Sequence, residues 1–394
     1  MTAIAPEWDA LPGAVMPFDW RAFADKHRIA FRELGGIGAV AGPAAFRLAL
    51  FAASQIGWLL DDIVDPRWRE TEMRGPLFIL GHQRSGTTFL HRLLAGDETH
   101  ARSLLFHEMI LPASSVQNAL ARLAAWDRGR GGRLTDWFQS KQNEKFGPLD
   151  NIHRLRFDEV EEDEFVLWAI YASAMCVNDS PISTANENLD FLRHYESWPE
   201  RQKIRALNWY KACVLKKVHR ETKVAGQAVW GVSKNPAFSQ KAPDLLKVFP
   251  DARMLYLLRN PMETIPSRLS LIRAIWRHRF PGFQDMTPQQ VKTIVADSIR
   301  TYLYAERDLA ALPDAGKLVI RYEDLTADPR KTVLSIYRHF KLPGPDESLA
   351  ARLNELKKRR RRHESKHRSS LAEFHLTENG LREQLKTVFQ HHEF

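Results

Sequence analysis

Apolar and polar positions alternate along the chain in a way that predicts short buried strands followed by helices. The first clear case lies between residues 76 and 94. An apolar run over 77–80 stops at Gly81, as a buried parallel strand does, and apolar residues then recur at helical spacing over 89–94. This stretch therefore predicts a strand, a tight loop and a helix.

The same pattern returns in the second half of the chain. Apolar runs over 229–232 and 254–258 flank a helical pattern over 236–248, which predicts a βαβ unit with parallel strands. A long helix is expected over 285–312 and a further strand over 317–321. Asp328 and Pro329 then open another helix.

The regions around these strands are predicted to be mainly helical. Residues 1–73 form a helical extension that closes near Pro66, and residues 113–228 form a helical insertion. Within the insertion a helix is expected over 158–174. Acidic residues at its start suit the helix dipole, so they are interpreted as caps and solvated side chains, namely Glu159, Glu161, Glu162 and Asp163.

The most apolar run, over 45–60, is interrupted by Arg47 and Gln55 and is short for a membrane span. It predicts a core helix or a subunit-interface helix rather than a bilayer-crossing one, which allows a homodimer. The alternative is a surface that docks on a membrane or on a lipidic substrate.

Composition narrows the class of partner and the compartment. The chain has 394 residues, a net charge of +9 and a pI near 9.5, which favour polyanionic partners or an anionic cofactor. The start of the chain lacks the features of a signal peptide. Only Cys176 and Cys213 are present, too few for a disulfide framework, so a cytoplasmic location is expected.

The loop over 81–88 has the length and glycine placement of a phosphate-binding loop, in which backbone N–H groups and a helix N-terminus bind an anion. Enzymes that use ATP or GTP place a lysine after the second glycine, where this chain has Thr87. A nucleoside triphosphate is therefore disfavoured. The cation stands earlier, at Arg84, whose planar guanidinium suits a phosphate or a sulfate.

The sequence RSGTT after an apolar strand resembles the 5′-phosphosulfate loop of the sulfotransferases, which use 3′-phosphoadenosine 5′-phosphosulfate (PAPS). The resemblance implies that this cosubstrate is bound by the loop, with Phe89 in the place of an aromatic side chain that stacks on adenine. The loop residues implied in binding are Gln83, Arg84, Ser85, Gly86, Thr87 and Thr88.

Two further elements resemble the same family. Arg259 ends a predicted strand, and Ser267 follows eight residues later in the next helix, as in the 3′-phosphate element of sulfotransferases. An arginine at a strand end and a hydroxyl in the next helix can converge on one phosphate. Lys234 ends another strand, where the family has a lysine that contacts the transferred group.

The candidates for the catalytic base are neighbours. Glu108 is the first candidate and His107 the second. Both lie after a predicted second strand, in a segment similar to one that carries a glutamate in protein-tyrosine sulfotransferases. A carboxylate within 159–163 is a further candidate. The histidine that cytosolic sulfotransferases carry after the strand lysine is absent, because Pro236 and Phe238 occupy those places.

The C-terminal part carries a basic run over 357–362. It is interpreted as a solvated helix end, as a patch for nucleic acid or anionic lipid, or as a contribution to cofactor attraction. The segment after it resembles the loop that covers the nucleotide in bacterial sulfotransferases. This resemblance adds three candidates for the 3′-phosphate, Lys366, His367 and Arg368, within a covering segment at about 357–394.

Together these signals predict an α/β, P-loop NTPase-like, three-layer fold with a central parallel sheet over 74–394 and a helical N-terminal extension. The resemblance implies direct in-line transfer of a sulfuryl group from PAPS to a hydroxyl, or an amine, of a small-molecule, lipid or sugar acceptor, without a metal. The alternatives are a P-loop kinase-like phosphotransferase and a non-catalytic nucleic-acid-binding protein that uses the basic run. Nucleic acid is not expected as a partner.

Overall fold

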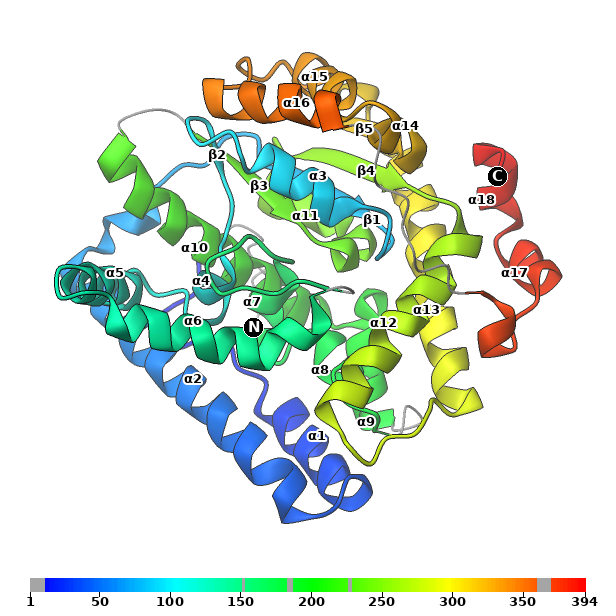
Figure 1. The fold of residues 1–394 in the computed structure, drawn as a ribbon, viewed down its shortest axis with the longest axis horizontal. Coiled ribbons are helices and arrows are strands. Elements are labelled where there is room, and N and C mark those ends of the chain that lie inside the picture. Colours follow the sequence, from blue (N-terminus) through cyan, green and yellow to red (C-terminus); the bar gives the residue numbers. More distant parts are fainter. Residues whose placement is uncertain (1–10, 151–152, 183–186, 226–228, 360–369) are drawn as a thin grey trace, which may run out of the picture. The chain divides into compact units, whose positions relative to one another are not determined.

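The computed structural model describes residues 11–150, 153–182, 187–225, 229–359 and 370–394 (Figure 1). The chain divides into two compact units, each assembled from separate segments. The first unit holds Met1–Glu72, Leu104–Ala225 and Arg273–Asp285, and the second holds Met73–Ser103, Gly226–Ile272 and Met286–Phe394.

The second unit is built on a parallel sheet whose strand order, in the described part of the chain, is β2-β3-β1-β4-β5. The central strand β1 pairs with β3 on one side and with β4 on the other, and Gly81 at its end lies opposite Leu257. The strands are β1 (Leu77–Gly81), β2 (Ala101–Arg102), β3 (Trp230–Lys234), β4 (Arg253–Leu258) and β5 (Lys317–Arg321).

Helices cover both faces of this sheet. Leu77 and Ile79 point to the face covered by α3 (Thr87–Leu94), α15 (Pro329–His339) and α16 (Glu347–Arg359), where the buried side chains form one apolar cluster. Phe78 points to the opposite face, where its ring meets those of Phe238 and Phe249 at 6.1 and 5.6 Å between centroids. The unit therefore has the three layers that the sequence predicts.

The second unit contains further helical elements, including the one that carries Phe238 on the Phe78 face of the sheet. They are η5 (Pro236–Gln240), α11 (Ala242–Val248), α13 (Pro288–Ala310), η6 (Asp314–Gly316), α14 (Tyr322–Ala327), η7 (Ala372–Phe374), α17 (Glu378–Gln384) and α18 (Lys386–His392). Helix α12 (Pro261–Arg279) begins in the second unit and ends in the first.

The first unit is helical in its described residues. Its longest members are α2 (Ile37–Val64) and α10 (Glu200–Ala225). The others are α1 (Trp20–Glu33), η1 (Pro66–Glu70), α4 (Phe106–Ile110), α5 (Ser114–Arg128), α6 (Arg133–Phe146), η2 (Gly147–Leu149), α7 (Glu164–Ala169), α8 (Met175–Asn178), α9 (Glu187–Asp190), η3 (Phe191–Arg193) and η4 (Tyr195–Ser197).

Most of the predicted elements are confirmed. The strand and helix around the loop, the parallel βαβ unit and the strand at 317–321 all form. Asp328 caps α15 by accepting a hydrogen bond from the Lys331 N–H at 3.0 Å. The helix predicted over 236–248 is instead a 3₁₀ turn followed by α11. Pro243 lacks the N–H that a continuous helix needs and favours a new helix start.

The prediction for the acidic segment is wrong. Residues 158–163 precede α7 rather than starting a helix, and Val160 forms an antiparallel bridge with Leu105. Glu161 and Asp163 are buried instead of solvated. Asp163 accepts a hydrogen bond from the Tyr210 hydroxyl at 2.6 Å, so a tertiary partner has replaced water.

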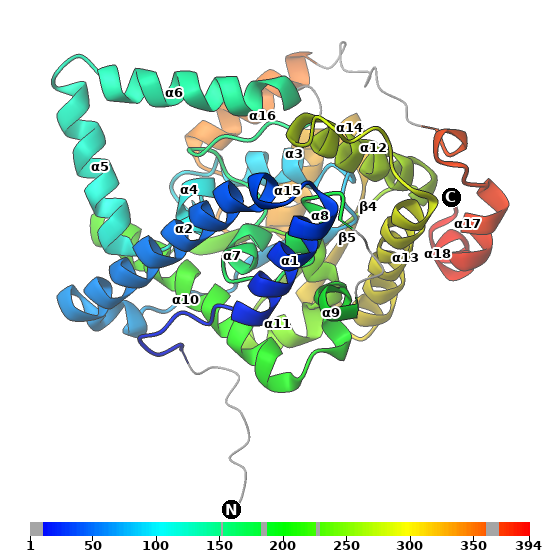
Figure 2. The same cartoon turned by 90° about the horizontal axis from the view of Figure 1, so that it is seen from below.

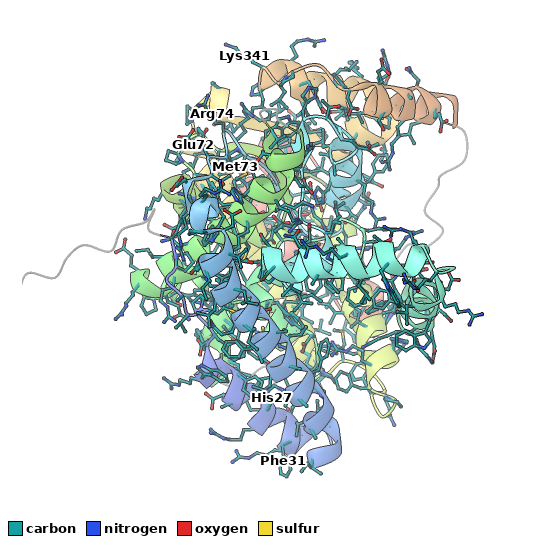
Figure 3. All side chains as sticks on the ribbon, turned by 90° about the vertical axis from the view of Figure 1, so that its left-hand side faces the viewer. His27, Phe31, Glu72, Met73, Arg74 and Lys341 are labelled. Carbon is teal, nitrogen blue, oxygen red and sulfur yellow. The ribbon has the colours of Figure 1, made fainter. Side chains whose placement is uncertain are left out.

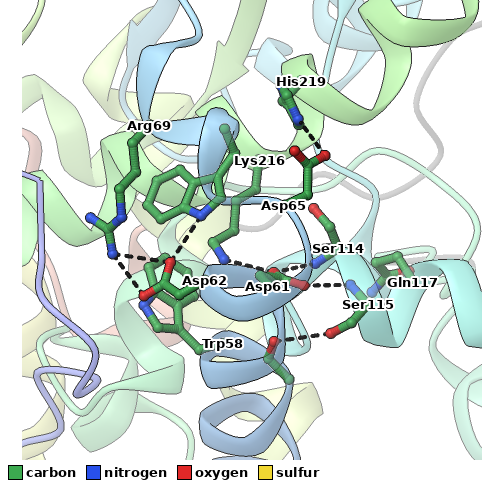
Figure 4. Close-up of polar contacts among 12 residues, drawn as sticks. Trp58, Asp61, Asp62, Asp65, Arg69, Ser114, Ser115, Gln117, Lys216 and His219 are labelled. Atoms are coloured by element: carbon green, nitrogen blue, oxygen red, sulfur yellow. Dashed lines mark hydrogen bonds and ion pairs between the residues drawn. The ribbon is translucent and has the colours of Figure 1, made fainter.

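A buried ion cluster joins three helices of the first unit (Figure 4). Asp61, near the end of α2, accepts hydrogen bonds from Lys216 Nζ at 2.6 Å and from the first two N–H groups of α5, those of Ser114 and Ser115, at 2.7 and 2.6 Å. The Lys216 ammonium also lies 3.8 Å from the ring centroid of Trp58. Burial lowers the pKa of Lys216, and Asp61 opposes that shift.

We predict that Asp61→Asn lowers the free energy of unfolding by about 3 kcal/mol, because it leaves the buried Lys216 charge without its counter-ion. Urea titration followed by circular dichroism measures this. Asp62→Asn is the matched control, since Asp62 pairs with Arg69 near the surface at 2.9 Å, and it should cost less than about 1 kcal/mol. Equal losses for the two variants would contradict the prediction. Adding Lys216→Met to Asp61→Asn should restore part of the loss.

Candidate functional site

The loop between β1 and α3 depends on backbone conformations that few residues adopt. Gly81 and Gly86 have φ of 135° and 87°, and Arg84, although not a glycine, has φ of 72°. A Cβ atom on Gly81 would lie 2.4 Å from the carbonyl oxygen of Leu257, and one on Gly86 would lie 2.8 Å from the ring of Tyr322. The glycines are therefore required by close packing as well as by backbone geometry.

The N-terminus of α3 is arranged to receive an anion. Gly86 is its N-cap residue and supplies no side-chain acceptor for the first N–H groups of the helix. Such N–H groups, together with the helix dipole, attract a phosphate or sulfate. The hydroxyls of Thr87 and Thr88 belong to this first turn. The predicted anion-binding loop thus has the local structure that its sequence implies.

Arg84 meets the predicted 3′-phosphate element. Its Nε atom donates to the Ser267 hydroxyl at 3.1 Å, and Nη1 of Arg259 donates to the Arg84 carbonyl oxygen at 2.8 Å. Ser267 lies two turns into α12 and Arg259 directly follows β4, as predicted. Arg84 therefore forms one cationic and hydroxyl-bearing cluster with two residues that lie more than 170 positions later in the chain.

Three further side chains contact Arg259. Glu263 accepts from its Nε and Nη2 atoms at 3.0 and 2.7 Å, and the ring of Tyr322 lies 4.0 Å from the guanidinium carbon. The Tyr302 hydroxyl donates to the Arg259 carbonyl oxygen at 2.8 Å. Tyr322 is not among the site residues predicted from the sequence. Its position directly after the last residue of β5, the strand beside β4, was the available signal.

Lys234 ends β3, as predicted, and its side chain is fully buried. Its Nζ atom donates to the Thr88 hydroxyl at 3.2 Å, which directs the ammonium to the first turn of α3. A buried cation at the carboxyl edge of a parallel sheet can stabilise negative charge on a bound anion.

His82 in the loop is a second residue that the sequence did not predict to have a role. Its ring stacks on that of Tyr302, with centroids 4.9 Å apart and planes 12° apart, and Nδ1 is 2.6 Å from the Gln83 carbonyl oxygen. Burial, with the nearby Arg268 charge, lowers the pKa of His82 to about 3. The imidazole is therefore neutral at physiological pH and anchors the loop by packing.

The other predicted loop residues differ in exposure. Ser85 is fully buried and its N–H donates to the His82 carbonyl oxygen at 3.1 Å, whereas Gln83 is half-buried. Phe89 has 38% of its surface exposed on α3, which leaves a ring face for stacking. Lys366, His367 and Arg368 lie outside the described residues, and their predicted roles stay predictions.

The base candidates His107 and Glu108 lie in the first unit, on the short helix α4. The strand that precedes them is β2, which ends at Arg102, so they do not follow a strand directly. Glu108 is buried and contacts two residues of α10, Lys217 at 2.9 Å and Arg220. It also accepts from the Leu105 N–H at 2.9 Å.

These contacts decide the ionisation of Glu108. Burial by itself would raise the pKa of the carboxyl group, but the charges of Lys217 and Arg220 and the Leu105 N–H outweigh burial and lower it. Burial lowers the pKa of the neighbouring His107, and the Glu108 charge opposes that shift. Both groups are therefore in their unprotonated forms near neutral pH. Among the residues that the structure describes, no group of three or more His, Cys, Asp or Glu side chains could hold a metal ion.

Comparison with known proteins identifies the family of this chain. The sequence profile of the sulfotransferase family matches residues 76–346, more than two thirds of the chain. Omega-hydroxy-beta-dihydromenaquinone-9 sulfotransferase Stf3 from Mycobacterium bovis is 28% identical over 296 residues, which are 71% of this chain and 66% of that protein. The same protein from Mycobacterium tuberculosis matches equally. The aligned region thus spans slightly less than two thirds of these relatives.

Solved structures show the same fold. Sulfotransferase STF1 from Mycobacterium tuberculosis has a TM-score of 0.62 at 20% identity, covering 92% of both chains. Sulfotransferase STF9 from Mycobacterium avium has a TM-score of 0.65 at 17% identity, covering 93% of this chain and 95% of that chain. By its profile match, its loop and its α/β P-loop-like fold, this chain belongs to the sulfotransferase family.

Proposed function

We propose that the protein is a sulfotransferase that takes a sulfuryl group from PAPS and transfers it to a hydroxyl of an apolar, lipid-like acceptor. The observation that carries the proposal is the joining of the anion-binding loop to the Arg259 and Ser267 pair through Arg84. A nucleotide with a 5′-phosphosulfate and a 3′-phosphate presents two separated anions. One cluster that combines two arginines, a buried lysine and hydroxyls suits such a ligand.

Different residues of the cluster are proposed to bind different parts of the nucleotide. Arg259 and Ser267 would bind the 3′-phosphate, and the N–H groups at the start of α3 would bind the 5′-phosphate. When bound, PAPS supplies the activated sulfuryl group. Lys234 and Arg84 would stabilise the negative charge that develops on the transferred group and on the oxygen that leaves it. Thr88 orients Lys234 for this task.

The acceptor class is proposed from the name of a relative. The curated relative acts, by its name, on omega-hydroxy-beta-dihydromenaquinone-9, a hydroxylated lipid. A hydroxyl on an apolar molecule is the corresponding acceptor class here. Its proton must pass to a base as the new sulfur–oxygen bond forms, and Glu108 is the proposed base, with His107 as the alternative.

Binding of 3′-phosphoadenosine 5′-phosphate tests the cosubstrate. We expect calorimetry to show tight binding to the wild type, with adenosine 5′-phosphate and ATP bound more weakly. Arg259→Ala should lower the affinity for 3′-phosphoadenosine 5′-phosphate by about 10- to 100-fold, as expected for loss of a charge-assisted contact. The same substitution should change the affinity for adenosine 5′-phosphate little, because that ligand lacks the 3′-phosphate.

Glu263→Gln is the matched control for this binding test. It keeps Arg259 and removes the carboxylate that competes with the phosphate for the guanidinium. Affinity should stay the same or rise. A preference for ATP, or no nucleotide binding at all, would overturn the assignment of PAPS.

Lys234→Met tests the step of sulfuryl transfer. We expect kcat to fall by at least about 100-fold, because the buried ammonium that stabilises the developing charge is lost. Binding of 3′-phosphoadenosine 5′-phosphate, which carries no sulfuryl group, should change much less. A loss of nucleotide affinity as large as the loss of kcat would instead make Lys234 a binding residue.

The pH dependence of the rate tests the base. A base must be unprotonated, so the rate falls as the pH drops through its pKa. Because the pKa of Glu108 is lowered, we expect the acid limb of kcat/KM to lie below the ordinary glutamate pKa of about 4.5. Glu108→Gln should lower kcat by at least about 100-fold.

The opposite outcome would identify His107. If His107 is the base, Glu108→Gln keeps activity. The acid limb of the pH–rate profile of this variant then lies at lower pH than in the wild type, because the carboxylate that raises the His107 pKa has been removed. His107→Asn would then abolish the rate, whereas it should have a small effect if Glu108 is the base.

A further inference from the structure

Helix α2 in the first unit has an apolar exposed side along its whole length. Ile37, Ile56, Ile63 and Val64 are more than half exposed, and α2 has no exposed charged residue. Among the described residues it is the one helix long and apolar enough to cross a membrane, yet only 11% of its most apolar stretch is buried. A core helix is covered by protein, so this side of α2 requires another explanation.

Polar groups hold the other side of α2 to the rest of the first unit. Arg47 donates to the Trp168 carbonyl oxygen, Ser54 to that of Ile110 at 3.3 Å, and Asp61 joins the buried cluster with Lys216. Figure 3 shows α2 with its side chains next to Phe31 at the end of α1. Because one side is fixed by buried hydrogen bonds, α2 does not match a helix surrounded by lipid on all sides.

Helices α5 and α6 continue the apolar side of α2. The start of α5 packs on Gly57, where a Cβ atom would lie 2.6 Å from Ala113 and Val116. The end of α6 returns to α2, with Lys145 Nζ 5.9 Å from the ring centroid of Phe46. Figure 2 shows α5 leaving α2 and α6 following it. We call the exposed side of α2, α5 and α6 the apolar surface.

Exposed apolar side chains are concentrated on this surface. Of the 20 large hydrophobic side chains that are exposed in the described residues, 14 lie on these three helices, which hold fewer than a sixth of those residues. Trp126 and Trp137 are 51% and 62% exposed. Tryptophan favours the boundary between water and lipid, where one side of the ring is apolar and the other is wet.

The charges beside the apolar surface are mainly positive. Helices α5 and α6, with the turn between them, carry six basic residues against three acidic ones. Of the acidic residues Asp127 is buried, where it accepts from the Leu134 and Thr135 N–H groups, and Glu144 pairs with Lys141 at 2.7 Å. Arg130 lies over the Trp126 ring at 4.4 Å. Exposed arginines beside exposed tryptophans match the headgroup region of an anionic bilayer.

We propose that the apolar surface of α2, α5 and α6 docks on the face of an anionic lipid bilayer, with α2 lying in the plane of the interface. This inference goes beyond the proposed function, because it concerns binding that needs neither donor nor acceptor. A second copy of the chain is the competing occupant. A two-fold dimer would bring the same basic side chains of both copies together, whereas anionic headgroups neutralise them.

Vesicle flotation tests the proposal. The purified wild type is mixed with vesicles of phosphatidylcholine alone or of equal amounts of phosphatidylcholine and phosphatidylglycerol. We expect strong binding to the anionic vesicles and weaker binding to the neutral ones. Ile56→Glu with Leu60→Glu should lower vesicle affinity by more than about tenfold, since two apolar side chains no longer enter the lipid. Arg128→Gln and Arg130→Gln should each lower the affinity for anionic vesicles by about fivefold.

Leu303→Glu is the matched control. Leu303 is 36% exposed on α13, which belongs to the second unit and not to the apolar surface, and its change should leave vesicle binding intact. Circular dichroism and binding of 3′-phosphoadenosine 5′-phosphate report whether each variant is folded. Their retention also separates a failure of this proposal from a failure of the proposed function.

Three outcomes would overturn the proposal. The wild type could fail to bind either vesicle, or the Ile56→Glu/Leu60→Glu variant could bind as well as the wild type. Light scattering could also show a lipid-free dimer that this variant dissociates while the wild type ignores vesicles, which would assign the apolar surface to a second copy.

Discussion

The second unit depends on the close approach of β1 and β4 at their carboxyl ends. Gly81 lies opposite Leu257, and the absence of a side chain at Gly81 allows the two backbones to come together there. This register carries the loop after β1 next to Arg259 after β4. The Arg259 guanidinium then reaches the carbonyl oxygen of Arg84, a residue 175 positions earlier in the chain. Parallel pairing is what turns two separate motifs into one anion-binding cluster.

The first unit depends on buried ion pairs that start from one helix. Lys216 and Lys217 are neighbours on α10, and they bind different carboxylates, Asp61 of α2 and Glu108 of α4. Each carboxylate also accepts backbone N–H groups, so neither charge is buried without partners. Glu108, the proposed base, is thereby fixed by the same helix that holds the end of α2. A buried carboxylate with two cationic partners stays ionised, which is the form that can accept a proton.

The apolar surface is the place where this unit departs from ordinary packing. On its other side, α2 is held by polar side chains such as Arg47, which donates to the Trp168 carbonyl oxygen. The exposed side of the same helix carries Ile56 and Leu60, which are 60% and 45% exposed. A family member whose acceptor is lipid-like would gain from such a surface, because apolar acceptors are concentrated in bilayers.

Several features were determined by the sequence alone. Local signals sufficed for the strand, loop and helix at 77–94, for the lysine at the end of β3 and for the helix cap at Asp328, because each depends on neighbours within a few residues. The family resemblance also followed from the spacing of short motifs. The same local reasoning failed for residues 158–163. Their acidic composition is typical of a helix start, but the Asp163 carboxylate is buried and accepts a hydrogen bond from the Tyr210 hydroxyl.

Only the tertiary structure decided which of these side chains meet. Arg259 stacks on Tyr322, and Glu108 pairs with residues of α10, although the partners are distant in sequence. His82 is neutral because distant segments of the chain bury it and place the Arg268 charge nearby. The exposure of the apolar side of α2 is of the same kind. The sequence shows that the run is apolar, but burial depends on what other segments cover, and no local pattern contains that information.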